Sequence, residues 1–318
     1  MTKPNMTRIL RAPDGIADAA KLLKQGALVA FPTETVYGLG ADATNGTAVA
    51  RVFAAKNRPS FNPLIAHVAD AEQAKHYVIW SDTAEQLARA FWPGPLSLVL
   101  PLRDDHGVSE LTTAGLSTLA IRIPAHPVAQ ALLRQVGVPV AAPSANPSGR
   151  ISPTTAAHAL AGLRGRIDAV LDGGPCPVGL ESTIGGLFDA PVLLRPGGLA
   201  SEDIEALLGC PLKQRAAEDP MSAPGQMQSH YAAESAVRLN AIAAREGEVL
   251  LGFGSINGAL NLSETGNLIE AAANLFGHLH QLDEMKRPIA VAPIPMTGLG
   301  VAINDRLSRA AAPRGTTK

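Results

Sequence analysis

Two cations stand two residues apart, directly before a proline. Lys56 and Arg58 begin the segment KNRPSFNPLIAHV, residues 56–68, where a helical pattern ends. In an extended chain both side chains can reach one site, and a point charge beside a guanidinium fork suits a polyphosphate. A solvated basic helix end, favourable to the helix dipole, explains the same pair. The pair alone leaves both interpretations open.

A loop rich in hydroxyl and amide groups follows a later strand-like run. The segment VPVAAPSANPSGRISPT, residues 138–154, carries Ser144, Asn146 and Ser152. Pro153 can begin a helix with Ser152 as its N-cap, and the free N–H groups at a helix N-terminus favour phosphate. A plain capped loop explains these residues equally well.

Three further segments place polar groups beside glycines or at strand ends. The first, PTETVYGLGADA (32–43), follows a strand-like run and combines hydroxyls, one carboxylate and two glycines. The others, LDGGPCPVGLESTI (171–184) and VLLRPGG (192–198), carry Ser182 and Arg195 near strand ends. Turns are rich in such residues, so each segment alone is also explained as an ordinary connection.

The sequence lacks the common nucleotide-binding loops. No GxxxxGK(S/T) P-loop occurs, so a nucleotide would have to be bound by another device. The loop GFGSING (252–258) has GxGxxxG spacing rather than that of a dinucleotide-binding loop. We expect a structural turn there.

The composition favours a packed protein and argues against several classes of function. Of 318 residues, 46% are hydrophobic and 17% charged, so disorder is not expected. The formal net charge is −1, so any contact with nucleic acid or nucleotide must come from a local basic patch. Cys176 and Cys210, without CxxC spacing, give neither a zinc module nor a disulfide framework. Without a signal-peptide pattern or an apolar run of membrane-spanning length, we expect a cytoplasmic protein that has no membrane contact.

Strand-like runs alternate with helical patterns over the first two thirds of the chain. Strands are predicted at 27–31, 64–68, 96–100, 118–123, 138–142, 168–171 and 181–186, and helices at 16–25, 47–56, 70–77, 83–91, 126–136, 154–162 and 201–208. This mixture predicts an α/β domain, residues 1–210. Residues 211–233 lack apolar periodicity and are typical of a linker. Further strand-like runs, with helices at 266–283 and 299–311, predict a smaller α/β domain over residues 234–318.

Taken together, these segments resemble the YrdC-like L-threonylcarbamoyladenylate (threonylcarbamoyl-AMP) synthase family, in its long two-domain form. The matching motifs follow the family's order: PTETVYGLGADA, KNRP with NPLIAHV, FWPGPLSLVLP (91–101), AIRIPAH (120–126), APSANPSG (142–149), LDGG, GLESTI and LRPGG. The segments APGQMQSHYAA (223–233) and TGLGVAINDRLSRAA (297–311) resemble the long form's linker and tail. The resemblance implies a twisted mixed sheet with a deep basic cavity, a linker over the active site and a smaller Rossmann-like α/β C-terminal domain.

The resemblance also implies a reaction. L-Threonine, bicarbonate and ATP would give threonylcarbamoyl-AMP and pyrophosphate, and the product would pass to threonylcarbamoyl-transfer proteins that modify adenosine in tRNA. Mg²⁺ would arrive with ATP, held mainly by phosphates and water, and no protein side chains are expected to form a metal site. Direct binding of tRNA or double-stranded RNA is left open.

The family's functional positions carry over residue by residue. Those assigned to the triphosphate and the reacting carboxylate match Lys56, Arg58, Ser144 and Asn146. The remaining ATP-contacting positions match Asn62, Thr118, Ser152 and Arg195, and Tyr231 of the linker is expected to contact ATP as well. Positions of the threonine site match Thr35, His67, Arg122, Ala142 through its backbone, and Ser182. Arg122 is expected to bind the amino acid's carboxylate bidentately.

Two departures and two alternatives accompany this interpretation. The linker reads MQSHYAA, without the family's usual basic residue before His-Tyr or the proline after Ala, and Ser97 stands where Thr is usual. A non-catalytic module that binds double-stranded RNA would use the same concave basic surface, although the net charge of −1 argues against it. A carbamoyltransferase of hydrogenase maturation contains a similar domain but adds zinc-finger cysteines, and this chain has two cysteines in total.

Overall fold

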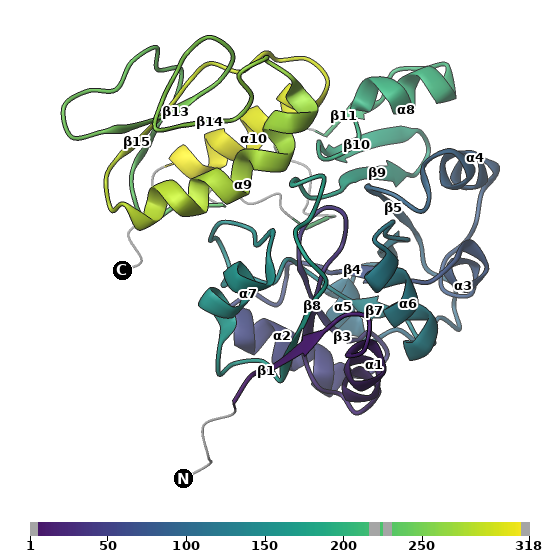
Figure 1. Ribbon diagram of the computed structural model, residues 1–318. Helices are drawn as coiled ribbons and strands as arrows, with labels where there is room; N and C mark the ends of the chain where they lie inside the picture. Colours follow the sequence, from purple (N-terminus) through teal and green to yellow (C-terminus); the bar gives the residue numbers. More distant parts are fainter. Residues whose placement is uncertain (1–5, 216–222, 225–230, 313–318) are drawn as a thin grey trace.

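The computed structural model describes residues 6–215, 223–224 and 231–312 (Figure 1). Within them the chain forms a large mixed sheet, flanked by helices, and a small parallel sheet packed against two longer helices. This arrangement confirms the predicted α/β class. No helix in the described part of the chain combines the length and the apolar character needed to cross a membrane.

The large sheet has eleven strands, which run both parallel and antiparallel to their neighbours. In spatial order they are β1 (Arg8–Arg11), β8 (Ala169–Asp172), β2 (Val29–Phe31), β3 (Gly38–Asp42), β7 (Val140–Ala141), β4 (Ile65–His67), β6 (Thr118–Arg122), β5 (Leu96–Pro101), β9 (Thr183–Leu187), β10 (Pro191–Arg195) and β11 (Lys213–Gln214). Several neighbouring strands, such as β1 and β8 or β5 and β9, are far apart in sequence, which brings motifs from the first two thirds of the chain to one sheet.

Helices cover both faces of this sheet. They are α1 (Ile16–Lys24), α2 (Gly46–Lys56), α3 (Ala71–Lys75), α4 (Asp82–Phe91), α5 (Glu110–Thr113), α6 (Pro127–Val136), α7 (Ala156–Leu163) and α8 (Ser201–Leu208). Side chains of β2 alternate between two cores, because successive residues of a strand point to opposite faces. Val29 and Phe31 pack with α1 and α6, whereas Ala30 packs with α2 on the other face.

The glycine-rich segment after β2 turns back as a strand of its own. Sequence patterning missed β3, which pairs with β2 on one side and with β7 on the other. A Cβ at Gly40 would lie 2.9 Å from the Phe31 ring and 3.0 Å from Val140, closer than neighbouring atoms allow. The glycine is therefore needed for strand packing at this position, independently of any ligand.

Two other predictions differ from the structure at prolines. The strand expected over 138–142 is reduced to β7, because Pro139 and Pro143 flank it and lack the N–H that a ladder needs. The helix expected from residue 154 begins later, with Thr155 as its N-cap, so the predicted cap at Ser152 is wrong.

Within the described residues, the small sheet has four parallel strands, and two helices pack against it. The strands, in spatial order, are β12 (Val237–Arg238), β15 (Ile289–Val291), β13 (Val249–Gly252) and β14 (Leu260–Asn261); the helices are α9 (Leu268–Glu284) and α10 (Leu299–Ala311), which lie against each other. The GFGSING loop is the expected structural turn: the carbonyl of Ile256 lies 2.1 Å from where a Cβ at Gly252 would be.

The core under the small sheet also takes in residues of the first two thirds of the chain. Val36, Ile151 and Leu180 are buried in the same cluster as Leu275 and Phe276 of α9. Burial of shared apolar surface gives the two parts of the chain a continuous packed contact rather than a loose one. That contact lies beside a polar cavity, because Val36 belongs to both.

Candidate active site

A narrow cavity opens where the ends of several strands meet. Its free space is about 50 Å³, room for a few water molecules. Nine of the residues expected from the sequence line it: Thr35, Arg58, His67, Arg122, Ala142, Ser144, Ser182, Arg195 and Tyr231. The lining also includes Thr33, Val36, Gly38, Ile65, Pro143, Glu181 and Pro224. Residues far apart in the sequence thus form one wall.

The end of α2 sets the positions of Lys56 and Arg58. Asn45 caps the helix by accepting from the N–H of Ala48, and the helix ends when Asn57 adopts a left-handed conformation, with φ of 52°. The N–H of Arg58 then bonds to the carbonyl of Phe53 at 2.9 Å. This sharp exit sends the lysine and the arginine to different neighbours.

Lys56 is fully buried and binds the backbone of the hydroxyl-rich loop. Its ammonium donates to the carbonyls of Ser144, at 2.5 Å, and Asn146. Burial, and secondly the charge of Arg58, lower the pKa of Lys56 well below its ordinary value. A polyanion brought nearby would favour the protonated amine. In the structure Lys56 holds the loop, and one of its three N–H donors remains beyond these two bonds.

Asn146 and Lys56 face a second hollow rather than the narrow cavity. This hollow, of about 520 Å³, lies between α7 and α9. The side-chain nitrogen of Asn146 donates to the carbonyls of Pro147, at 3.0 Å, and Arg150, at 2.8 Å. Its buried Oδ1 has no hydrogen-bond partner among the described residues. The loop therefore separates the two spaces.

Arg58 and Arg195 bring buried positive charge to the narrow cavity. Arg58 donates to the carbonyls of Asn62, at 3.3 Å, and Pro63, at 2.9 Å. Burial is the main cause that lowers the pKa of Arg58 to about 10, with a contribution from the charge of Arg195, so the guanidinium stays protonated at neutral pH. Arg195 donates to the carbonyl of Ser182 at 2.7 Å and to that of Pro224 at 3.3 Å.

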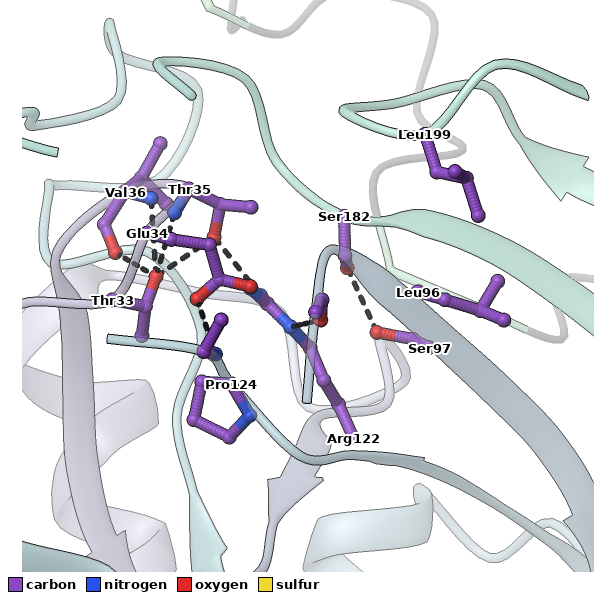
Figure 2. Close-up of polar contacts among 12 residues, drawn as sticks. Thr33, Glu34, Thr35, Val36, Leu96, Ser97, Arg122, Pro124, Ser182 and Leu199 are labelled. Atoms are coloured by element: carbon purple, nitrogen blue, oxygen red, sulfur yellow. Dashed lines mark hydrogen bonds and ion pairs between the residues drawn. The ribbon is translucent and has the colours of Figure 1, made fainter. Parts of the chain in front are cut away.

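Arg122, at the end of β6, is held by a carboxylate. Its NH2 donates to Oε1 of Glu34 at 2.6 Å, its NH1 to the Thr35 hydroxyl at 2.9 Å, and its Nε to the carbonyl of Gly94 at 3.1 Å. Figure 2 shows the guanidinium facing Glu34 and Thr35. These bonds use three of five N–H donors, so one on each terminal nitrogen remains to bind a ligand carboxylate.

A neutral histidine and two hydroxyls complete this side of the cavity. His67 lies opposite Arg122 in the β4–β6 pairing, and burial, followed by the charge of Arg122, lowers its pKa to about 3. The hydroxyls of Ser97 and Ser182 lie 2.8 Å apart (Figure 2). Ala142 also lines the cavity, and its N–H bonds to the carbonyl of Ile65 at 3.0 Å. Such groups bind a small polar molecule by hydrogen bonds rather than by charge.

Besides Lys56, three expected ATP-contacting residues lie outside the narrow cavity. Asn62 is fully buried, and its carbonyl accepts from Arg58. Thr118 begins β6 and so lies at the opposite end of that strand from Arg122. Ser152 is buried and donates its hydroxyl to the carboxylate of Glu181. None of these three positions touches the cavity surface as the wall is arranged here.

Sequence reasoning missed two carboxylates, Glu34 and Glu181, and a third residue that binds one of them, Arg306. Arg306 of α10 donates to Glu181 at 2.7 Å. Burial would raise the pKa of Glu181, but the charges of Arg306 and Arg195 and the bond from Ser152 outweigh it, so the pKa is lowered. Both carboxylates stand beside hydroxyl residues in motifs quoted above. Their arginine partners lie 88 and 125 positions away, which no local pattern reveals.

Two described residues of the linker reach the cavity. Pro224 and Tyr231 line the wall, while residues 216–222 and 225–230 lie outside the described residues. The Tyr231 ring stacks on Phe276 of α9 with ring centroids 5.7 Å apart. Tyr231 therefore belongs to the cavity wall and to the core under the small sheet at once.

Comparisons with known proteins cover most of the chain. Residues 21–197 match the Sua5–YciO–YrdC family model, described as telomere recombination, and residues 199–312 match that of the threonylcarbamoyl-AMP synthase C-terminal domain. The threonylcarbamoyl-AMP synthase of Bacillus subtilis is 42% identical over 94% of this chain and 93% of its own length. That of Pyrococcus abyssi is 41% identical over 92% of each.

A solved structure extends the likeness to three dimensions. The crystal structure of P. abyssi Sua5 complexed with L-threonine superimposes with a TM-score of 0.88 at 38% identity, covering 96% of this chain and 97% of that one. Since both family models and relatives of matching length agree, the chain belongs to the Sua5–YciO–YrdC family, in the two-domain form that carries the threonylcarbamoyl-AMP synthase C-terminal domain.

Proposed function

We propose that this chain makes threonylcarbamoyl-AMP from L-threonine, bicarbonate and ATP, with release of pyrophosphate. One observation carries the proposal: a single cavity gathers cations suited to a nucleotide together with the polar groups suited to an amino acid. Arg58 and Arg195 stand there with Arg122 and Ser182. The relatives named threonylcarbamoyl-AMP synthase match over nearly their full length, which supports the same activity here.

The chemistry requires alignment and charge neutralisation more than a nucleophilic side chain. Threonine and bicarbonate give N-carboxythreonine and water, and the new carboxylate attacks the α-phosphorus of ATP. An O–P bond forms as the bond to the β-phosphate oxygen breaks, and pyrophosphate leaves with the electron pair. Arg58, Arg195 and a protonated Lys56 are suited to the charge on the phosphates. Ser144 lines the same cavity, whereas Lys56 and Asn146 face the second hollow and would reach the phosphates after the wall rearranges.

The amino acid is expected on the Arg122 side of the cavity. The two remaining N–H groups of Arg122 can bind the threonine carboxylate in a fork. The hydroxyls of Thr35 and Ser182, with neutral His67, are suited to its hydroxyl and amine. The proximity of this subsite to the cations of Arg58 and Arg195 supports transfer between the two bound substrates.

ATP is far larger than the free space of about 50 Å³, so parts of the wall must move when it binds. Pro224 and Tyr231 are wall residues contributed by the linker. We therefore propose that the chain consists of a catalytic domain (1–210), a linker over the site (211–233) and a small α/β domain (234–318). Contacts of Asn62, Thr118 and Ser152 with ATP belong to the same proposal and would require that rearrangement.

Mg²⁺ is proposed as part of the nucleotide substrate, held by phosphates and water. Among the described residues, no group of three or more His, Cys, Asp or Glu side chains is arranged to hold a metal ion. The product, a mixed anhydride, would be consumed by threonylcarbamoyl-transfer proteins acting on tRNA. That use of ATP and tRNA supports a cytoplasmic location. Direct contact of this chain with RNA is a separate question that a binding measurement can answer.

The alternative of a non-catalytic module for double-stranded RNA makes a different prediction. Its affinity would come from a basic surface and would fall steeply with salt. The formal net charge of −1 and the burial of Arg58, Arg122 and Arg195 disfavour such a surface.

Omission of single substrates tests the proposal. Pyrophosphate release should require threonine, bicarbonate and ATP together, and should fall to background when any one is left out. Release that continues without threonine or bicarbonate would reduce the activity to ATP hydrolysis and contradict the proposal.

A further inference from the structure

Arg306 of α10 is a fully buried arginine that reaches out of the small α/β part toward the cavity wall. Its Nε donates to Oε2 of Glu181 at 2.7 Å, and its NH2 donates to the carbonyl of Pro196 at 3.0 Å. Its NH1 donates to Asp305 at 2.6 Å. The guanidinium carbon lies 5.0 Å from the centre of the Tyr231 ring. One side chain therefore joins three separate segments of the chain.

Each of those segments belongs to the cavity wall or adjoins it. Glu181 and Tyr231 line the cavity, and Pro196 directly follows Arg195, which lines it too. Arg195 in turn donates to the carbonyl and the hydroxyl of Ser182, the residue after Glu181. Displacing Glu181 would therefore shift the backbone carbonyl that holds the guanidinium of Arg195, while the hydroxyl of Ser182 keeps its bond to Ser97 at 2.8 Å. Arg306 itself lies behind this wall.

The shape of the guanidinium matters as much as its charge. A planar fork can bind Glu181, Asp305 and a carbonyl in three directions while its face packs on an aromatic ring. A lysine keeps the charge, but its three N–H donors radiate from one nitrogen at the end of a flexible chain, so they do not match acceptors that are spaced around a planar fork. Asp305 also pairs with Arg309, one turn along the helix, at 2.9 Å, which fixes the far side of the fork.

We propose that Arg306 is a positioning residue for the nucleotide half of the site, through which the last helix holds Tyr231, Glu181 and Arg195 in place for ATP. The inference rests on the proposed function, because it concerns the half of the cavity assigned to ATP. It gives the small α/β part of the chain a role in substrate binding that acts through the cavity wall. The threonine half, built around Arg122 and Glu34, has no contact with Arg306 among the described residues.

The test uses full-length protein with Arg306→Met, Arg306→Lys and, as a control, Arg89→Met, which removes an exposed helical arginine that pairs with Glu85. Steady-state pyrophosphate release gives KM for ATP and for threonine, calorimetry gives ATP affinity without threonine, and thermal unfolding gives stability. We expect Arg306→Met to raise KM for ATP at least tenfold while KM for threonine stays within twofold. Arg306→Lys should restore less than half of the lost ATP affinity, and Arg89→Met should leave both KM values within twofold.

A purely structural role gives a different pattern. If Arg306→Met lowers the unfolding temperature but keeps wild-type KM for ATP, or raises both KM values alike, the proposal is wrong. Should Arg306→Met fail to fold, Arg306→Lys decides alone: an unchanged affinity for ATP refutes the proposal. If the wild-type chain releases no pyrophosphate in the complete assay, the proposed function fails, and the calorimetric comparison with ATP still tests the role of Arg306.

Discussion

Arg122 lines the cavity beside the carboxylate of Glu34, whereas Arg58 and Arg195, within the described residues, donate to backbone carbonyls and one serine hydroxyl. The three side chains are all nearly inaccessible to solvent. A buried charge is costly unless it is paired, so the two arrangements differ in what they leave for a ligand to do.

The difference separates two kinds of substrate recognition. The ion pair of Arg122 with Glu34 has no net charge, and Glu34 fixes the orientation of the guanidinium. This arrangement suits the single carboxylate of an amino acid. Arg58 and Arg195 form no ion pair with a carboxylate among the described residues. Besides burial, the charge of Arg58 lowers the pKa of Lys56, and that of Arg195 lowers the pKa of Arg58. A polyphosphate supplies the missing negative charge. The same residue type thus serves both substrates through a difference in local partners.

Removing the carboxylate from the Arg122 side should have the largest effect. Glu34→Ala leaves the buried guanidinium of Arg122 without its partner, and breaking a buried pair from one side costs about 3–5 kcal/mol. The free energy of unfolding in urea measures the loss. Glu72→Ala is the control, because Glu72 pairs with Lys75 at the surface and such pairs contribute about 0–1 kcal/mol. If both variants lose the same free energy of unfolding, the pair of Arg122 with Glu34 contributes no more than a surface ion pair, and the proposed charge balance is wrong.

Arg58→Ala should act on the nucleotide rather than on the amino acid. Loss of one charge-assisted contact costs about 1.5–3 kcal/mol in transition-state binding, roughly a 10- to 150-fold fall in kcat/KM for ATP. KM for threonine should stay within twofold, and Arg103→Ala, at an exposed ion pair, should change neither. Pyrophosphate release at varied ATP and threonine gives both values. Wild-type kinetics for Arg58→Ala would show that this cation does not bind the phosphates.

His67 gives a pH test of the environment around Arg122. Burial, and then the charge of Arg122, lower the pKa of His67 from 6.5 to about 3 in the folded protein. The unfolded chain therefore binds a proton between these values that the folded chain does not. This contribution to stability is complete above pH 6.5 and is lost as the pH falls toward 3, by about 2 kcal/mol between pH 6.5 and 4.5.

Comparison of wild type with His67→Gln isolates that contribution. Urea unfolding at several pH values should show a shallower loss of stability on acidification in the variant. If the two proteins lose stability in parallel, His67 is not held neutral by its surroundings.

The comparison also shows what the sequence could and could not predict. Local chemistry was visible: Lys56 and Arg58 at a helix end and Ser144 on a loop were singled out from residue type and spacing. The α/β class followed from alternating patterns. The pairing of Arg122 with Glu34 was not visible, because it depends on β6 and the segment after β2 meeting at one end of the sheet.

Strand β3 and the place of Tyr231 show the same limit. The sequence of β3 is rich in glycine and therefore resembles a loop. Its glycines allow close packing on Phe31, and this contact replaces the strand-forming side chains that a sequence pattern would detect. The linker composition predicted no core, yet Tyr231 is 1% exposed and packs on Phe276, where α9 supplies the apolar surface that the linker lacks. Tertiary partners decided both cases.

The preference for threonine over its analogues should be the smallest of these effects and the finest probe of the Arg122 side. Valine matches threonine in shape but lacks the hydroxyl, so polar groups near Thr35 and Ser182 lose a partner. Those hydroxyls already bond to Thr33 and Ser97, at 2.7 and 2.8 Å, which compensates part of the loss. We therefore expect a penalty of about 1–2 kcal/mol, roughly 5- to 30-fold in kcat/KM.

Serine keeps the hydroxyl and loses one methyl group, which costs about 0.8 kcal/mol, roughly fourfold. The predicted order of kcat/KM is thus threonine, serine, valine, measured by pyrophosphate release with each amino acid at saturating ATP and bicarbonate. Ser182→Ala should narrow the gap between threonine and valine, because it removes one of the groups that valine leaves unpaired. Equal turnover of valine and threonine by the wild-type chain would mean that the hydroxyls beside Arg122 do not read the side chain, and that this side of the cavity recognises the carboxylate alone.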